Sequence, residues 1–303
     1  MFKIKYIYTN KISLTQLPII LTTKITNSKL SAQINHSGAE LFSLKNNNNK
    51  EYIWEGNPTF WGKHSPILFP IVGTLKNNSY CYEGNEYHLS RHGFARDMKF
   101  ELIKKTENSA TFSLGSSIET RRVYPFDFEL QVKYSLDENK LIIEYKIINK
   151  NDILLPFSIG AHPAFALPKP FENYSLAFEH SEKLTSYQLE NDLLSEISDT
   201  INTNKNQMPL TYSLFEKDAL IFKTLKSRTI DILENGAPLL RVRFDDFPNL
   251  GIWTKNNAPF LCIEPWFGYS DTVNCSGNIL EKEGMQLLKE NETFNSRFSI
   301  EIF

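Results

Sequence analysis

The chain has 303 residues, and its 33 basic and 35 acidic side chains leave a net charge of −2. This balance gives no electrostatic basis for binding nucleic acid or an anionic membrane surface, and neither is expected as a partner. The longest apolar run near the N-terminus, residues 17–21, is far too short to cross a bilayer. Three widely spaced cysteines, without a CxxC pair or a zinc-ligand spacing, indicate a reduced, cytoplasmic protein.

Apolar and polar residues alternate in short segments along the whole chain, which is the pattern of half-buried β-strands. Turn-forming residues such as Gly84 separate these segments into pairs. The predicted pairs are 80–82 with 87–89, 100–102 with 110–114, 128–136 with 143–147, and 230–232 with 240–244, followed by a final strand at 298–303. Helical periodicity is limited to one or two turns at 210–215, and no linker divides the chain. The sequence therefore predicts a mostly β, single-domain fold, built as an antiparallel sandwich or barrel.

Three short motifs concentrate the chemically active side chains. They are residues 91–96 (RHGFAR), 160–165 (GAHPAF) and 262–269 (CIEPWFGY). Their imidazoles, His92 and His162, give or take a proton near neutral pH, and the carboxylate of Glu264 acts as a base. The aromatic members Phe94 and Trp266 suit a cleft that stacks on the flat apolar faces of a ligand, as sugars have.

Proline follows two of these candidates, His162 and Glu264. A residue before proline is restricted to extended backbone, which suits a side chain that must be aimed. Glu264 also follows an apolar stretch, residues 259–263, so its carboxylate is expected to be partly desolvated and tuned towards base strength. Cys262 is interpreted as a small apolar packing residue. His64 is a further candidate for lining the cleft.

Simpler structural interpretations stay open for these residues taken singly, with His92 as a turn residue and Glu264 as the polar end of a strand. The histidines show no metal-ligand spacing, and the sequence has no glycine-rich phosphate loop and no GxSxG motif. The sequence therefore predicts neither a metal nor a cofactor.

At these motifs the sequence resembles the aldose 1-epimerase (galactose mutarotase-like) family, and most closely its LacX-like branch. Further matching segments are residues 25–27, 38–41, 65–73 and 282–284, together with the final strand. The resemblance covers residues 25–303 and implies a β-supersandwich fold and a metal-free, cofactor-free mutarotase, expected as a monomer or homodimer. It leaves residues 1–24 as an N-terminal extension: an added edge strand, a flexible arm or an upstream start codon.

The resemblance also implies roles for single residues. Glu264 matches the general base of the family and His162 the general acid, while His92 matches a second histidine that hydrogen-bonds near the sugar ring oxygen. Asp218 matches an aspartate that binds sugar hydroxyls, and Arg96 belongs to the RHGFAR motif and is expected to line the cleft. The implied reaction interconverts the α and β anomers of an aldohexose.

The sequence departs from the family at Thr74, where LacX-like chains commonly carry an arginine. In true mutarotases the corresponding arginine contacts the sugar. Threonine supplies neither the charge nor the forked donors of arginine, so weak binding of simple hexoses is expected. Lys63, Lys76 or Arg96 are candidates to compensate. Two alternatives therefore stay open: a mutarotase for hexose phosphates, with Arg91 among its cations, and a non-catalytic protein that binds or senses carbohydrate.

Overall fold

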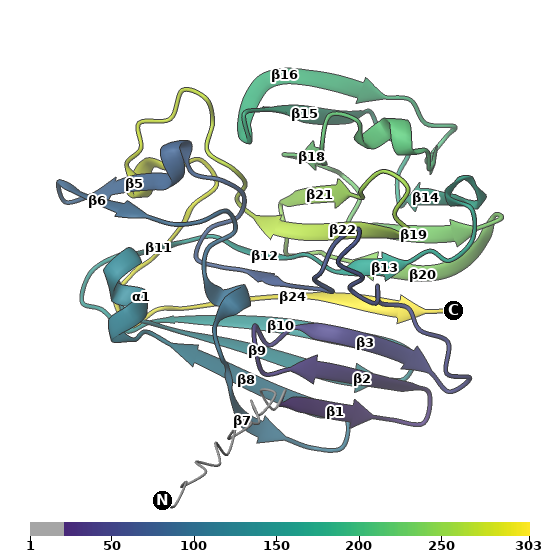
Figure 1. Cartoon of the computed structure of the whole chain (residues 1–303), viewed down its shortest axis with the longest axis horizontal. Helices are drawn as coiled ribbons and strands as arrows, with labels where there is room; N and C mark the ends of the chain where they lie inside the picture. Colours follow the sequence, from purple (N-terminus) through teal and green to yellow (C-terminus); the bar gives the residue numbers. More distant parts are fainter. Residues whose placement is uncertain (1–20) are drawn as a thin grey trace, which may run out of the picture.

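Antiparallel β-strands make up most of the computed structural model, which describes residues 21–303 (Figure 1). The helices of this part of the chain are short, namely one α-helix, α1 (Ile118–Val123), and five 3₁₀ helices. The 3₁₀ helices are η1 (Lys76–Asn78), η2 (Ala95–Asp97), η3 (Phe171–Asn173), η4 (Tyr212–Phe215) and η5 (Ile279–Glu281). Helix η4 falls on the helical turn predicted at 210–215. Within residues 21–303, no helix is both long enough and apolar enough to span a membrane.

The largest sheet has nine strands and contains three of the four predicted hairpins. In spatial order its strands are β17 (Gln207–Pro209), β14 (Tyr174–Phe178), β19 (Thr229–Glu234), β20 (Ala237–Arg243), β24 (Thr293–Ile302), β10 (Lys140–Asn149), β9 (Phe128–Asp137), β8 (Ser109–Gly115) and β7 (Glu101–Lys105). Alternate residues of β9 and β10 are buried, as the period of two in their sequences predicts. The mostly β, antiparallel class is therefore confirmed.

The second large sheet has eight strands and carries Glu264 in one of them, with His162 between two others. Its strands are β16 (Leu193–Ile201), β15 (Leu184–Glu190), β18 (Leu220–Phe222), β21 (Asn249–Trp253), β22 (Phe260–Phe267), β12 (Ile159–Ala161) and β4 (Ile67–Leu68), with β13 (Ala164–Ala166) also paired to β22. Strand β22 is buried along almost its whole length, since both of its faces are covered. Glu264 lies in this strand and is therefore enclosed by the fold rather than exposed at a strand end.

Three small sheets complete the fold. They are β1 (Thr22–Thr26), β2 (Leu30–Asn35) and β3 (Leu41–Asn46); β5 (Ser79–Tyr82) and β6 (Asn85–His88); and β11 (Leu155–Phe157) with β23 (Gln286–Leu288). The β1–β3 sheet packs over β8 and β9 (Figure 1), where the Tyr134 hydroxyl donates to the carbonyl of Ala39 at 2.7 Å. Strand β1 begins at Thr22, inside the predicted extension of residues 1–24, and residues 1–20 of that extension lie outside the described part.

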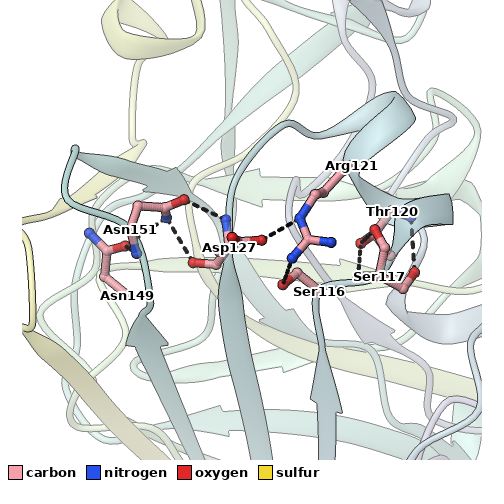
Figure 2. A network of polar contacts seen from close by, with 7 residues as sticks. All are labelled: Ser116, Ser117, Thr120, Arg121, Asp127, Asn149 and Asn151. Carbon is pink, nitrogen blue, oxygen red and sulfur yellow. Dashed lines mark hydrogen bonds and ion pairs between the residues drawn. The ribbon is translucent and has the colours of Figure 1, made fainter.

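A polar network fixes the loops at one end of β8, β9 and β10 (Figure 2). Helix α1 begins with a capping box, in which Thr120 N–H donates to Ser117 Oγ and Ser117 N–H donates to Thr120 Oγ1. Asp127 pairs with Arg121 through its side chain and with the Asn151 amide through its backbone. The hydrogen bond from Arg121 lowers the pKa of Asp127. These contacts join α1 to the strands without contributing to the cavity described next.

Candidate active site

Side chains from all three motifs line one cavity of about 280 Å³. Its wall is formed by Trp61, Val72, Gly73, Arg91, His92, Arg96, His162, Leu189, Asp218, Ala219, Ile221, Trp253, Glu264, Trp266 and Ser270. A larger hollow of about 620 Å³ lies over β7–β10 and β24 but contains none of the motif residues. Chemistry rather than volume therefore identifies the candidate site.

Strand pairing brings Glu264 and His162 together. Gly160 of β12 pairs with Trp266 and Ala164 of β13 pairs with Cys262, so the intervening His162 comes opposite Glu264. Its Nε2 lies 3.3 Å from Glu264 Oε2, with Glu264 1% and His162 8% exposed. An acid and a base therefore lie next to each other in a part of the cavity wall that is almost completely shielded from solvent.

Burial governs the protonation of this pair. It raises the pKa of Glu264 well above 4.5, an effect that the Arg91 guanidinium opposes and the Asp218 carboxylate reinforces. Burial also lowers the pKa of His162 to about 3. Because both shifts favour the uncharged forms, the two groups together hold one proton over the pH range between these pKa values.

The raised pKa of Glu264 predicts that Glu264→Gln stabilises the protein at neutral pH. A carboxyl whose pKa is higher in the folded state favours folding below 4.5, its unfolded value, and progressively opposes it as pH rises through the folded value. At neutral pH a buried carboxyl must either be ionised without a good partner or be kept protonated, and an amide avoids both costs, which are typically ~1–3 kcal/mol. Urea unfolding across this pH range should show a stability gain that is absent below 4.5 and grows above it.

Glu283→Gln is the matched control for this prediction. Burial of Glu283 is outweighed by its hydrogen bonds with Lys223 and Tyr269, so its pKa is lowered rather than raised. The linkage then has the opposite sign, and the control variant should lose stability above pH 4.5. Equal pH dependence of both variants would contradict the assignment of the Glu264 shift.

His92 occupies an unusual backbone conformation beside this pair. Its φ of 69° and the φ of 70° at Gly93 turn the chain so that the imidazole enters the cavity wall. The Gly73 N–H donates to its Nδ1 at 3.0 Å, which places the proton of the neutral ring on Nε2. Arg91 Nε lies 3.3 Å from Nε2 but cannot also donate to it, because a neutral imidazole has only one acceptor nitrogen. Burial and the neighbouring His162 lower the pKa of His92, so His92 offers an N–H donor.

Gly93→Ala is expected to destabilise the protein by at least ~2 kcal/mol, which urea unfolding would measure. A Cβ at Gly93 would lie 2.3 Å from the carbonyl oxygen of Phe69, in addition to the strain of the positive φ. Gly84→Ala is the control, since Gly84 has a φ of 76° but a Cβ there meets nothing within 4 Å. Equal losses in both variants would show that only the backbone conformation matters.

Three tryptophans surround the catalytic candidates. Trp61 stacks on His162 with ring centroids 4.7 Å apart, and Trp253 approaches the same ring edge-on at 5.8 Å. The predicted cleft residue Trp266 lies against Gly160 and Gly251, where a Cβ would come within 2.6 and 2.3 Å of its ring. Its indole N–H is buried and has no hydrogen-bond partner among the described residues. Trp61 and Trp253 were not predicted as site residues.

Two other predicted residues, Asp218 and Arg96, also line the cavity. Asp218 has a φ of 81°, and its Oδ1 accepts a hydrogen bond from the Ala219 N–H at 2.7 Å. Arg96 donates from Nη2 to the carbonyl of Arg91, whose own guanidinium forms an exposed ion pair with Asp192 at 3.2 Å. The cavity is thus bordered by one carboxylate and two guanidinium groups besides the buried pair.

Phe94 and His64 do not line the cavity, contrary to the sequence prediction. The Phe94 ring packs against Phe69 and Phe128 of the main core, with centroids 6.2 and 6.0 Å away. His64 is held by a contact of 2.7 Å between its Nδ1 and the carbonyl of Trp54. Phe94 therefore contributes to the main core, and His64 is bonded to the backbone at Trp54.

Thr74 is buried, and its Oγ1 has no hydrogen-bond partner among the described residues. It stands next to Gly73 in the cavity wall but does not itself line the cavity. Lys63 bonds Asp97, and Lys76 bonds a backbone carbonyl, so neither of them replaces the missing arginine. Of the three predicted substitutes, only Arg96 reaches the cavity.

A buried ion pair between Lys282 and Asp271 fixes the segment that contains Ser270. Lys282 Nζ lies 3.0 Å from Asp271 Oδ1, and both side chains are 3% exposed. Lys282 also donates to the carbonyl of Tyr269, and Asp271 accepts from the backbone N–H of Lys76. Ser270 is held between these anchors and accepts a hydrogen bond from the Thr74 N–H.

Comparison with known proteins gives the family. The sequence profile of the family named aldose 1-epimerase matches residues 22–301. The chain belongs to the aldose 1-epimerase family. The family places it among epimerase-type isomerases that act on carbohydrates.

Similar proteins support the same placement of this aldose 1-epimerase family member. The plasmid-encoded LacX protein of Lactococcus lactis subsp. lactis is 38% identical over 277 residues, which are 86% of this chain and 92% of LacX. A galactose mutarotase related enzyme from Lactobacillus acidophilus superposes with a TM-score of 0.89 at 35% identity, covering 93% of this chain and 97% of the other. A galactose mutarotase-like protein from Lactobacillus casei gives a TM-score of 0.89 at 30% identity, covering 93% and 100%. The predicted LacX-like resemblance and the mutarotase-like fold are thereby confirmed.

Proposed function

We propose that this chain interconverts the α and β anomers of an aldohexose. The buried contact between Glu264 and His162, 3.3 Å apart, carries the proposal. Opening a pyranose ring needs a base at the anomeric hydroxyl and an acid at the ring oxygen, and both oxygens are bonded to the same carbon. Two proton-transfer groups side by side in one cavity wall match that requirement.

The pair holds one proton, and the reaction proceeds from the arrangement in which this proton has moved from Glu264 to His162. Glu264 takes the proton of the anomeric hydroxyl while His162 gives its proton to the ring oxygen, and the C1–O5 bond breaks to leave the aldehyde. C1 then turns about the C1–C2 bond. On closure, the C5 hydroxyl returns its proton to His162, the new C1–O5 bond forms on the other face, and Glu264 returns its proton to O1. His92 supports both directions by donating its Nε2–H near the ring oxygen.

The rest of the cavity suits one sugar ring. Its volume of about 280 Å³ lies at the lower end of small-molecule sites. Trp61, Trp253 and Trp266 offer apolar faces for the C–H side of the ring, and Asp218 offers an acceptor for its hydroxyls.

Polarimetry on freshly dissolved α-glucose and α-galactose tests the proposal. We expect the protein to accelerate the approach to anomeric equilibrium on at least one of these sugars. No acceleration on free or phosphorylated hexoses would instead favour a non-catalytic protein that binds carbohydrate.

One observation favours hexose phosphates as a second candidate substrate class. Arg91 and Arg96 both line the cavity, and two guanidinium groups at one border are suited to hold a phosphate. Polarimetry on hexose 6-phosphates beside the free sugars separates the two classes, because only a phosphate-specific enzyme would lose most of its turnover on plain hexoses.

A cytoplasmic location is supported by Cys81, Cys262 and Cys275, which are all free thiols. Monomer or homodimer stays a prediction, which size-exclusion chromatography with light scattering would test.

A further inference from the structure

Among residues 21–303, one group combines three kinds of metal ligand. The ligand atoms of His162, Cys262 and Glu264 all lie within 4.8 Å of one another, and all three residues are buried. Cys262 and Glu264 are two residues apart on β22, so their side chains share one face of the strand. His162 reaches the same face through the pairing of β12 and β13 with β22.

We propose that the Glu264–His162 pair, together with the Cys262 thiolate, binds a borderline-soft divalent cation such as Zn²⁺. The bound ion occupies both proton-transfer groups at once, so it acts as an inhibitor and not as a cofactor. The inhibition rests on the proposed mutarotase function, whereas the binding of the ion does not.

The geometry of the pair fits the ion. Tetrahedral zinc, with bonds of about 2.0–2.2 Å to nitrogen and oxygen, separates two such ligands by roughly 3.3–3.5 Å. The Glu264 Oε2 to His162 Nε2 distance is 3.3 Å. With a Zn–S bond of about 2.3 Å, the sulfur of a bound cysteine lies roughly 3.6 Å from the nitrogen. In this structure the ligand atoms of Cys262, His162 and Glu264 are all within 4.8 Å of one another.

An unpartnered ligand atom and the charge balance of the site also support the binding of a divalent cation. Glu264 Oε2, the oxygen that faces His162 Nε2, is buried and accepts no hydrogen bond from the described residues. One carboxylate, one thiolate and one neutral imidazole bring the charge of a divalent ion to zero, which suits a buried site. Binding releases the Cys262 proton to solvent. Asp218 favours the cation, while Arg91 and Arg96 at the cavity border oppose it.

The ligand types also set selectivity. A thiolate and an imidazole favour Zn²⁺ and Cd²⁺ over Mg²⁺ and Ca²⁺, which prefer oxygen ligands. Mg²⁺ is therefore a matched negative control for every measurement below.

Cadmium spectroscopy tests the binding directly. In untagged Cys81→Ser/Cys275→Ser protein, Cys262 is the one remaining thiol of the sequence. Titration with Cd²⁺ should give an ultraviolet thiolate-to-cadmium band that saturates at one equivalent. Adding Cys262→Ala, or Cys262→Val to keep apolar volume, should abolish the band, and adding Glu264→Gln should weaken binding at least ~10-fold. No band in the parent variant, or a band that survives either change at Cys262, would overturn the proposal.

Inhibition of mutarotation by Zn²⁺ tests the second part of the proposal, which is that the bound ion blocks the acid–base pair. Zn²⁺ should inhibit mutarotation competitively with the sugar, and Cys262→Ala should raise the inhibition constant at least ~10-fold, measured against the turnover of that variant without zinc. Equal inhibition of both proteins would overturn the role of Cys262. If the chain is not a mutarotase, the cadmium band is still expected, so the two proposals fail separately.

Discussion

Glu264→Gln is expected to lower mutarotation turnover by at least ~10²-fold, because the amide keeps the size of the side chain but cannot take the proton of the anomeric hydroxyl. The substitution sits in a strand that is buried on both faces, so a smaller or larger residue would disturb packing as well. Polarimetry at saturating sugar, with the uncatalysed rate subtracted, measures the effect.

The matched control is Glu283→Gln, which removes a carboxylate of the same type outside the cavity lining. Its turnover should stay close to that of the wild-type protein. Because Glu264→Gln is also expected to gain stability, unfolding cannot explain its loss of turnover. Near wild-type mutarotation by Glu264→Gln would refute the assigned base and, with it, the proposed mechanism.

Asp271→Ala is expected to destabilise the fold by about 3–5 kcal/mol, because it leaves the Lys282 ammonium buried without its counter-charge. Both side chains are 3% exposed, and the remaining hydrogen bond from Lys282 goes to a neutral carbonyl. Burial lowers the pKa of Lys282, with Asp271 opposing that shift, so loss of the carboxylate pushes the amine further towards its neutral form. Urea or thermal unfolding measures the loss.

Two further variants sharpen this test. Asp245→Ala breaks the exposed ion pair with Arg243 and should cost less than ~1 kcal/mol. Asp271→Leu combined with Lys282→Met removes both charges and should recover most of the stability lost in Asp271→Ala. If the double variant is as unstable as the single one, the hydrogen bonds of Asp271 to the backbone matter more than its charge.

The hairpin of β9 and β10 was predictable because alternate residues of each strand are buried. Every apolar residue of β9 is buried, and in β10 Leu141, Ile143, Tyr145 and Ile147 are buried while Ile142 and Ile148 lie on the partly exposed face. The hairpin of β15 and β16 was not predicted, because residues 196–200 are exposed on both faces and carry no alternating pattern. An edge strand whose pairing depends on backbone hydrogen bonds has no alternating side-chain pattern, so it is difficult to recognise in a sequence.

The sequence predicted which side chains line the cavity where a backbone restriction accompanies a chemically active side chain. The prolines after His162 and Glu264 mark aimed side chains, and both line the cavity with His92, Asp218, Arg96 and Trp266. Their roles in the reaction stay predictions. Phe94 was misplaced because nearness to His92 in the motif does not reveal which face of the segment it occupies.

Trp253 could have been found only from strand register. Gly251 pairs with Glu264 and Trp253 pairs with Cys262, which puts Trp253 on the strand face that carries the acid–base group. No local pattern in the sequence reports that pairing. Trp61 comes from an irregular segment, where neither of the two side-chain periods applies.

The tryptophans of the cavity give this protein a built-in optical reporter. The chain has four tryptophans, and Trp61, Trp253 and Trp266 line the cavity, whereas Trp54 packs against Phe60 and Phe260. Most of the intrinsic emission therefore arises within contact distance of whatever occupies the cavity. A sugar that displaces water from these rings should shift the emission maximum, and a bound heavy ion beside His162 should quench it. Fluorescence titration of the unlabelled wild-type chain would thus follow occupancy without any turnover.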